Sequence, residues 1–151
     1  MKLTCRVNAK TEVLDVEPLT PLIEVLRERL ALIGAHQGCT GDNCGACTVL
    51  VNDVPVYSCQ VPVCQVEGAE VRTVEGLTSD PERLAPLQAA LAKAGATACG
   101  FCTPGMLMTG LALRQRQPRP GPEELRSLLS GNLCRCTGYE AIVQAMLQVI
   151  Q

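Results

Sequence analysis

Ten cysteines constrain this 151-residue chain more than any other feature, because eight of them fall into two groups with the spacing of metal ligands. In the second half, the strings CGFC and CRC supply four thiols, and a Thr and then a Pro or Gly follow each string. Such residues commonly begin helices, whose N-termini would direct partial positive charge toward an anionic cluster. We therefore expect one metal ion or cluster to be held by Cys99, Cys102, Cys134 and Cys136.

The first cysteine group has the spacing CxxxxCxxC at Cys39, Cys44 and Cys47, and Cys59 follows a strand pair later. This is the plant-type ligand spacing of a 2Fe-2S cluster. Three glycines allow one loop to fold around a cluster and to turn backbone N–H groups toward it. Four thiolates would also suit a structural zinc ion, but zinc sites usually combine two short knuckles.

Several other residues have simpler interpretations. Cys5 lies in a β-favouring run and is expected in the core, and Cys64 is expected not to ligate metal. His36 precedes the first group, where a Rieske-type imidazole ligand is the alternative to a surface or hydrogen-bonding role. The CxxC at 99–102 also occurs in thioredoxin-like redox pairs, but those open a helix within a βαβ unit.

Composition narrows the class of protein. The formal net charge is −2 without long charged runs, which argues against a nucleic-acid partner. The N-terminal residues alternate and carry charge, unlike a signal peptide, and no apolar run reaches membrane-spanning length. In a reducing compartment the cysteines would be metal ligands, so we expect a cytoplasmic protein. A secreted disulfide scaffold, or export with a signal-bearing partner, are the alternatives.

A shift in composition after Gly76 predicts two domains, over residues 1–76 and 87–151, joined by a linker over 77–86. The first is expected to be a small mixed sheet with one helix over 21–32, ended by Gly34. The expected strands cover 3–7, 11–16, 48–51, 54–57, 61–66 and 70–74, and the expected helices of the second domain cover 87–94, 105–115, 123–129 and 140–150.

Three strings, GCTGDNCGACTV, CGFCTPGM and GNLCRCTGY, together resemble the small iron–sulfur subunit of the molybdenum hydroxylases. That family includes enzymes of the xanthine dehydrogenase, aldehyde oxidase and carbon monoxide dehydrogenase type. The resemblance runs from the first strand to the last helix. It implies an α+β fold, in which a plant-ferredoxin-like β-grasp domain precedes an all-α four-helix bundle, with one 2Fe-2S cluster in each.

The resemblance also implies roles for individual residues. The first cysteine group would hold the cluster that faces flavin, and the second group the cluster nearest the molybdenum pterin. Cys136, Cys99 and Phe101 would lie near the pterin of the partner. Two departures from the family pattern affect contacts rather than ligation: Ala98 stands where the family commonly has a pterin-contacting Gln, and Thr40, Asp42 and Asn43 replace its usual Gly- and Glu-containing run.

The implied function is electron transfer within an oxidoreductase complex, with no substrate chemistry on this chain. Electrons would pass from a large molybdopterin-binding subunit through two 2Fe-2S clusters to FAD on a medium subunit, or to an external acceptor. A zinc-stabilised interaction module and a freestanding redox carrier are the competing functions.

Overall fold

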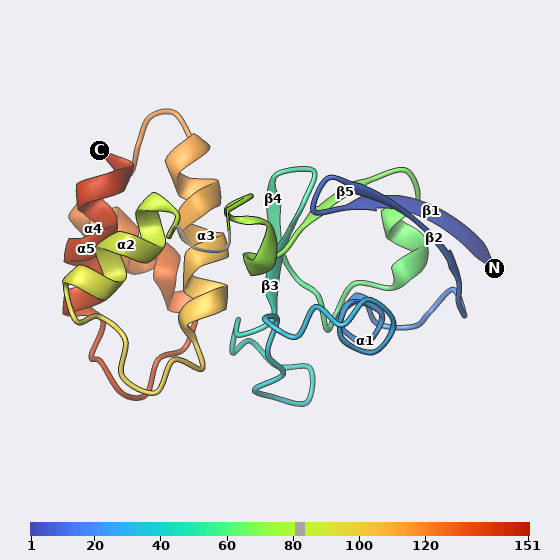
Figure 1. The fold of residues 1–151 in the computed structure, drawn as a ribbon. Coiled ribbons are helices and arrows are strands. Elements are labelled where there is room, and N and C mark those ends of the chain that lie inside the picture. The colour runs from blue at the N-terminus through green and yellow to red at the C-terminus, as the bar shows by residue number, and fades with distance from the viewer. Residues whose placement is uncertain (81–83) are drawn as a thin grey trace.

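The computed structural model describes residues 1–80 and 84–151, so residues 81–83 of the predicted linker lie outside the described residues. The first half contains a mixed sheet with the strand order β2-β1-β5-β3-β4 (Figure 1). Strands β1 and β5 are parallel, and the other neighbouring pairs are antiparallel. The strand bounds are Lys2–Val7 for β1, Lys10–Asp15 for β2, Thr48–Val51 for β3, Val54–Tyr57 for β4 and Glu70–Arg72 for β5.

Two hairpins join neighbouring strands of the sheet, and both turns have left-handed backbone. Asn8 and Ala9 join β1 to β2 with φ of 49° and 67°, and Asn52 and Asp53 join β3 to β4 with φ of 49° and 64°. Positive φ at both central residues matches the twist of a two-residue hairpin, and Asn and Asp tolerate it best after glycine. Cys5 is buried in β1, in the core as predicted.

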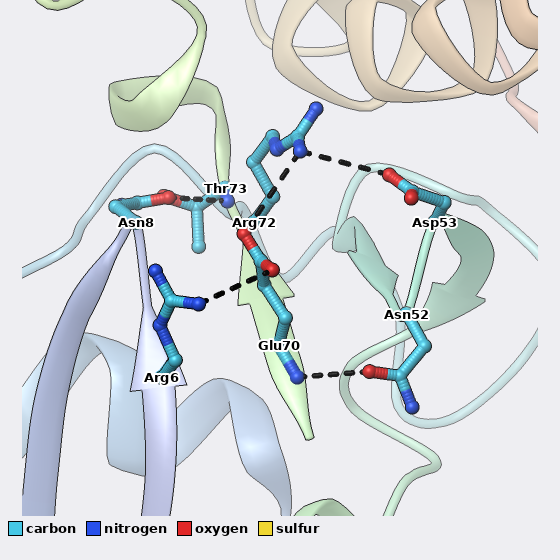
Figure 2. A network of polar contacts seen from close by, with 7 residues as sticks. All are labelled: Arg6, Asn8, Asn52, Asp53, Glu70, Arg72 and Thr73. Atoms are coloured by element: carbon cyan, nitrogen blue, oxygen red, sulfur yellow. Dashed lines mark hydrogen bonds and ion pairs between the residues drawn. The ribbon is translucent and has the colours of Figure 1, made fainter.

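The two turn asparagines also hold the short strand β5 between the hairpins (Figure 2). Asn8 Oδ1 accepts a hydrogen bond of 2.9 Å from the N–H of Thr73, and Asn52 Oδ1 accepts one of 2.9 Å from the N–H of Glu70. The exposed ion pair between Arg72 and Asp53 has an N–O distance of 3.6 Å and contributes little in water. Side-chain amides therefore extend the hydrogen bonding of a strand that is too short to be held by its ladder alone.

The predicted helix over 21–32 is wrong in length. It consists of α1, Leu22–Glu24, and a π-helix over Val25–Arg29. The helix ends there because Ala31 adopts a φ of 54° and the N–H of Leu32 turns back to the carbonyl of Leu26. Gly34 therefore does not end it, and instead its N–H donates to Glu75 Oε1 at 2.7 Å.

The predicted strand over 61–66 is also wrong, because Val63–Val66 forms a 3-10 helix. Pro62 has no N–H to donate to a ladder, and the flanking residues bond to the first residue of α1 and to the segment before it. Val63 N donates to Thr20 O, and Leu22 N donates to Val61 O. The last expected strand, 70–74, ends early at Arg72 and passes into a 3-10 helix over Val74–Gly76.

The second half is helical, and its four helices match the predicted positions within two residues. They are α2 over Pro86–Lys93, α3 over Thr103–Gln115, α4 over Pro122–Leu128, continued by a 3-10 turn over Leu129–Gly131, and α5 over Glu140–Ile150. Helix α5 packs against the other three. The core of this half is separate from that of the sheet and includes Met106, Leu125, Met146 and Ile150.

Helix α3 lies between the two halves. It packs on β3 and β4 on one side and on α2 and α5 on the other, and Figure 1 shows it beside the sheet. None of the helices in the described residues combines the length and hydropathy needed to cross a bilayer.

Candidate metal centres

The strand register places two cysteines of the first group side by side. Cys47 directly precedes β3 and Cys59 follows β4, and these strands pair with Thr48 opposite Tyr57. The side chain of Ser58 reinforces this end of the hairpin, since its Oγ donates to the carbonyl of Cys47 at 2.7 Å. The two sulfurs lie 3.4 Å apart as a result.

The other two cysteines of this group form a second pair on the loop before β3. The thiols of Cys39 and Cys44 are hydrogen-bonded to each other, and Gly41 turns the chain between them with a φ of 105°. The N–H of Cys44, together with those of Gly41 and Asp42, lowers the pKa of the Cys39 thiol. The loop thus turns backbone donors toward a sulfur, as its glycines predicted.

The more buried thiols of the first group resist ionisation. Burial, followed by the hydrogen bond and negative charge of Cys47, raises the pKa of Cys59 to about 12. Burial also raises the pKa of Cys44. Four crowded thiols of this kind ionise together only when a bound cation compensates their charge.

The second group also consists of two pairs, which come from the loops before α3 and α5. Cys99 and Cys136 lie 3.7 Å apart between their sulfurs, and both side chains are exposed. Cys102 and Cys134 share a hydrogen bond. Both loops, though far apart in sequence, therefore contribute one thiol to each pair.

Of the two helices expected to follow the second-group cysteines, only one begins immediately after a cysteine. Helix α3 begins at Thr103, immediately after Cys102. Helix α5 begins at Glu140, because a turn at Gly138 and Tyr139 with φ of 65° and 70° separates it from Cys136. In place of a helix end, the hydroxyl of Thr137 lies 3.0 Å from the sulfur of Cys134.

Hydrogen bonds and burial shift the pKa values of the second-group thiols in different directions. Burial, then the hydrogen bond with Cys134, raises the pKa of Cys102 to about 12. Burial opposes ionisation of Cys134 as well, but the Thr137 hydroxyl and nearby N–H groups outweigh it and lower its pKa. The N–H of Phe101 lowers the pKa of Cys99, and the hydrogen bond with Cys99 raises that of Cys136.

The distances between paired sulfurs indicate which kind of metal centre the thiols could hold. Separations of 3.4 and 3.7 Å far exceed an S–S bond of about 2.0 Å. Thiolates bound at about 2.3 Å to one tetrahedral metal lie about 3.8 Å apart. The thiols of each group lie in two pairs. Two thiols at each of two metal atoms is the ligand arrangement of a 2Fe-2S cluster, so the residues present fit that group.

The two remaining cysteines lie in other surroundings. Burial, then the nearby carboxylates of Glu12 and Glu67, raises the pKa of Cys5. Cys64 is half-buried in the 3-10 helix, where its N–H donates to the carbonyl of Pro18. That neither takes part in a ligand set stays a prediction.

Sequence reasoning did not find the polar contacts that join the two ligand groups. Asn132 Nδ2 donates to the carbonyl of Gly45 at 2.9 Å and to Thr48 Oγ1 at 3.1 Å. The hydroxyl of Tyr57 donates to the carbonyl of Gly131 at 2.8 Å. Gly45 and Asn132 both occur in the cysteine strings, but nothing in the sequence pairs them.

His36 and Phe101 form a second contact between the groups. Their rings stack with centroids 4.7 Å apart, and His36 Nδ1 lies 2.8 Å from the carbonyl oxygen of Phe101. A carbonyl only accepts, so Nδ1 carries a proton and donates. The Phe101 ring also lies against Gly38, where an added Cβ would approach its Cε1 to 3.0 Å and the sulfur of Cys44 to 3.2 Å. His36 thus has the hydrogen-bonding role predicted for it.

Two family descriptions match the sequence. Residues 5–99 match the 2Fe-2S iron–sulfur cluster binding domain, and residues 73–147 match the 2Fe-2S binding domain. The first match includes the whole first group and also Cys99, and the second match includes the whole second group.

Solved structures share the whole fold. A chain of quinoline 2-oxidoreductase from Pseudomonas putida 86 is 41% identical with a TM-score of 0.93, and the match covers 99% of this chain and 92% of that one. The aldehyde oxidoreductase from Desulfovibrio gigas is 35% identical with a TM-score of 0.94, over 99% of this chain and 17% of that one.

Among curated relatives, aldehyde oxidase 1 of Oryctolagus cuniculus is 46% identical over 87% of this chain. The chain spans only 11% of the length of that relative, so it corresponds to one part of a much longer protein. The chain belongs to the 2Fe-2S cluster binding family and is an iron–sulfur component of the molybdenum hydroxylase family, as its three cysteine strings predicted.

Proposed function

We propose that this chain is the electron-transfer subunit of a molybdenum-containing hydroxylase or dehydrogenase. Electrons from the molybdenum pterin of a large partner would pass through two 2Fe-2S clusters to FAD on a medium subunit or to an external acceptor. The observation that carries this proposal is one hydrogen bond of 2.8 Å from the N–H of Leu133 to the carbonyl of Cys44. It joins a first-group cysteine directly to the residue before a second-group cysteine, Cys134.

In this proposal each cysteine group holds one cluster, and each cluster supplies reversible one-electron chemistry when bound. The ligands are Cys39, Cys44, Cys47 and Cys59 for the first, and Cys99, Cys102, Cys134 and Cys136 for the second. The chain itself supplies donors that offset the negative charge of thiolates and clusters. These are the N–H groups that face Cys39 and Cys99 and the hydroxyl beside Cys134.

Exposure supports an entry point for electrons at the second group. Cys99 and Cys136 are exposed, and they share this region with the apolar side chains of Phe101 and Leu133, which are 47% and 59% exposed. An exposed thiol pair beside apolar side chains suits a surface that a pterin-binding partner covers. Ala98 would offer that partner no side-chain hydrogen bond.

Exposure also supports an exit at the first group, since the loop over residues 40–43 is exposed beside Cys39. The domain limits 1–76 and 87–151, with a β-grasp domain and a four-helix bundle as their folds, belong to the same proposal. Two separate hydrophobic cores, one for the sheet and one for the helices, support it.

Anaerobic purification of the full chain tests this function. We expect iron and acid-labile sulfide in equal amounts, visible absorbance that bleaches on reduction, and two distinguishable EPR signals in the reduced protein. Colourless protein with zinc and no sulfide would favour an interaction module instead. Co-purification with a molybdopterin-containing chain separates a subunit from a freestanding carrier, for which a soluble monomer without partners is expected.

A further inference from the structure

We propose that Asn132 is a positioning residue for electron transfer between the two clusters, an inference that rests on the proposed function. By fixing the first-group loop against the second-group loop, its side chain sets the distance and coupling across which the electron moves. With both clusters bound, the step that Asn132 would serve is the movement of one electron from the second group to the first, with no bond made or broken.

The side-chain amide of Asn132 is buried and makes three hydrogen bonds with other protein groups. The residue is 3% exposed. Its amide nitrogen donates to Gly45 O and Thr48 Oγ1, and its amide oxygen accepts a bond of 2.8 Å from Thr109 Oγ1. A buried polar network that is fully satisfied is rigid and specifies one arrangement of the segments that it joins.

The two groups that accept from the amide nitrogen are close in sequence to proposed ligands. Gly45 lies between Cys44 and Cys47, and Thr48 directly follows Cys47. Asn132 itself stands two residues before Cys134. The two bonds from its nitrogen therefore connect ligand-bearing segments of different groups, rather than two parts of one core.

The region where Asn132 contacts Gly45 is the junction between the two halves. Backbone segments approach so closely there that only glycine fits at two positions. A Cβ added at Gly45 would lie 2.1 Å from the carbonyl oxygen of Gly131. One added at Gly105, three residues after Cys102, would lie 2.3 Å from the carbonyl oxygen of Gly45. Segments that carry ligands of both clusters thus meet at one point, and Asn132 is the side chain that bonds them there.

The backbone of Asn132 is also linked by hydrogen bonds to Cys134, a ligand of the second group. Its carbonyl accepts a bond of 2.9 Å from the hydroxyl of Tyr139, which in turn accepts one of 2.8 Å from the N–H of Cys134. A displacement of Asn132 would therefore reach Cys134 through two hydrogen bonds.

The junction also has room to shift if the amide is removed. A cavity of about 300 Å³ lies between the halves, and its lining includes Thr48, Tyr57, Thr109 and Asn132. Shortening Asn132 would enlarge this space and remove the donor to Gly45 O that comes from the helical half, while the bonds to Gly45 O from Thr48 of the sheet half would remain. The first-group loop would then be held less firmly against the second.

The full chain with both clusters provides the test, through Asn132→Ala and a matched control, Thr109→Val. Valine has nearly the shape of threonine but lacks the hydroxyl that donates to Asn132. Thr109 and Asn132 both belong to the helical half. The control therefore keeps the bonds from Asn132 to Gly45 and Thr48 in the other half. The measurements are the rate of electron transfer between the clusters after flash photoreduction and the magnetic dipolar coupling between the two reduced clusters by EPR. Iron content and unfolding temperature are recorded for both variants.

In Asn132→Ala we expect the transfer rate to fall about tenfold and the dipolar coupling to change, with both clusters still present. Thr109→Val is expected to lower the unfolding temperature and to change rate and coupling much less than Asn132→Ala, because both bonds to the first-group loop remain. If Asn132→Ala does not fold, Tyr57→Phe removes the neighbouring cross-half bond to Gly131 and is expected to slow transfer in the same direction by a smaller factor.

An unchanged rate and coupling in Asn132→Ala would overturn the positioning role. If that variant does not fold, unchanged values in Tyr57→Phe would do so. Equal slowing in Thr109→Val would also overturn it, because general loosening of the helical half would then explain the effect. A different result would contradict the proposed function, namely that the unaltered chain does not contain two clusters.

Discussion

The N–H of Leu133 donates a hydrogen bond to the carbonyl of Cys44, and this bond closes a continuous path from a first-group sulfur to a second-group sulfur. The path runs from the side chain of Cys44 through its carbonyl and the hydrogen bond to the backbone of Leu133, and on to the thiol of Cys134. The side chain of Leu133 is 59% exposed, so the contribution of this residue to the path comes from its backbone.

Leu133→Pro removes the donor of this bond. We expect both clusters to form and the electron transfer between them to slow, while stability falls by about 1–3 kcal/mol because the Cys44 carbonyl loses its partner. Flash photoreduction and chemical denaturation measure the two effects. Leu133→Ala keeps the N–H and is the control, and a similar slowing in that variant would contradict the backbone path.

Replacing one ligand is expected to remove one cluster only. Cys59→Ala and Cys102→Ala should each lose about half of the iron and sulfide and a different one of the two EPR signals, since each cluster needs four thiolates. Cys64→Ser should keep the full content. Iron and sulfide analysis with EPR measures this, and loss of both clusters in either alanine variant would argue against two independent ligand sets.

Gly45→Ala is expected to destabilise the protein severely. Gly45 has a φ of 71°, and an added Cβ would lie 2.1 Å from a backbone oxygen, which cannot move away as a flexible side chain would. Gly68→Ala is the matched control, because Gly68 has a φ of 69° and nothing within 4 Å of an added Cβ.

The control should cost about 1–2 kcal/mol, the strain of a left-handed residue. Gly45→Ala should cost at least about 4 kcal/mol, which only a disrupted junction would produce. Denaturation of the cluster-loaded variants gives both values, and equal losses would show that strain alone matters at Gly45.

Phe101→Ala should expose the first cluster loop to solvent. The ring and the sulfur of Cys44 both lie next to Gly38, so removal of the ring opens this side of the loop. We expect visible absorbance to decay about tenfold faster in the presence of an iron chelator, in the range that residues around metal ligands contribute. Val13→Ala, which removes a 68% exposed apolar side chain from β2, should decay at the normal rate. An unchanged rate in Phe101→Ala would show that the ring does not protect the loop.

Where sequence reasoning about the fold was wrong, contacts made by distant segments outweighed the local pattern. The apolar spacing predicts a helix to residue 32, yet Ala31 turns left-handed and ends it. The β-favouring run at 61–66 bonds to the segment before α1 and becomes a 3-10 helix. Residues of both segments pack into the same hydrophobic core.

The sequence by itself determined the two cysteine groups, both hairpin turns and the four helices of the second half. These features depend on residues that are near one another in the chain: thiol spacing, Asn at a tight turn, and apolar residues at helical intervals. The family could be recognised for the same reason.

Only the tertiary structure decided how the two groups are joined. The bonds from Asn132 to Gly45 and Thr48 and the stacking of His36 on Phe101 connect segments that lie far apart in the sequence. Such contacts follow from the packing of α3 between the sheet and the other helices, and no local pattern encodes which residues that packing brings together.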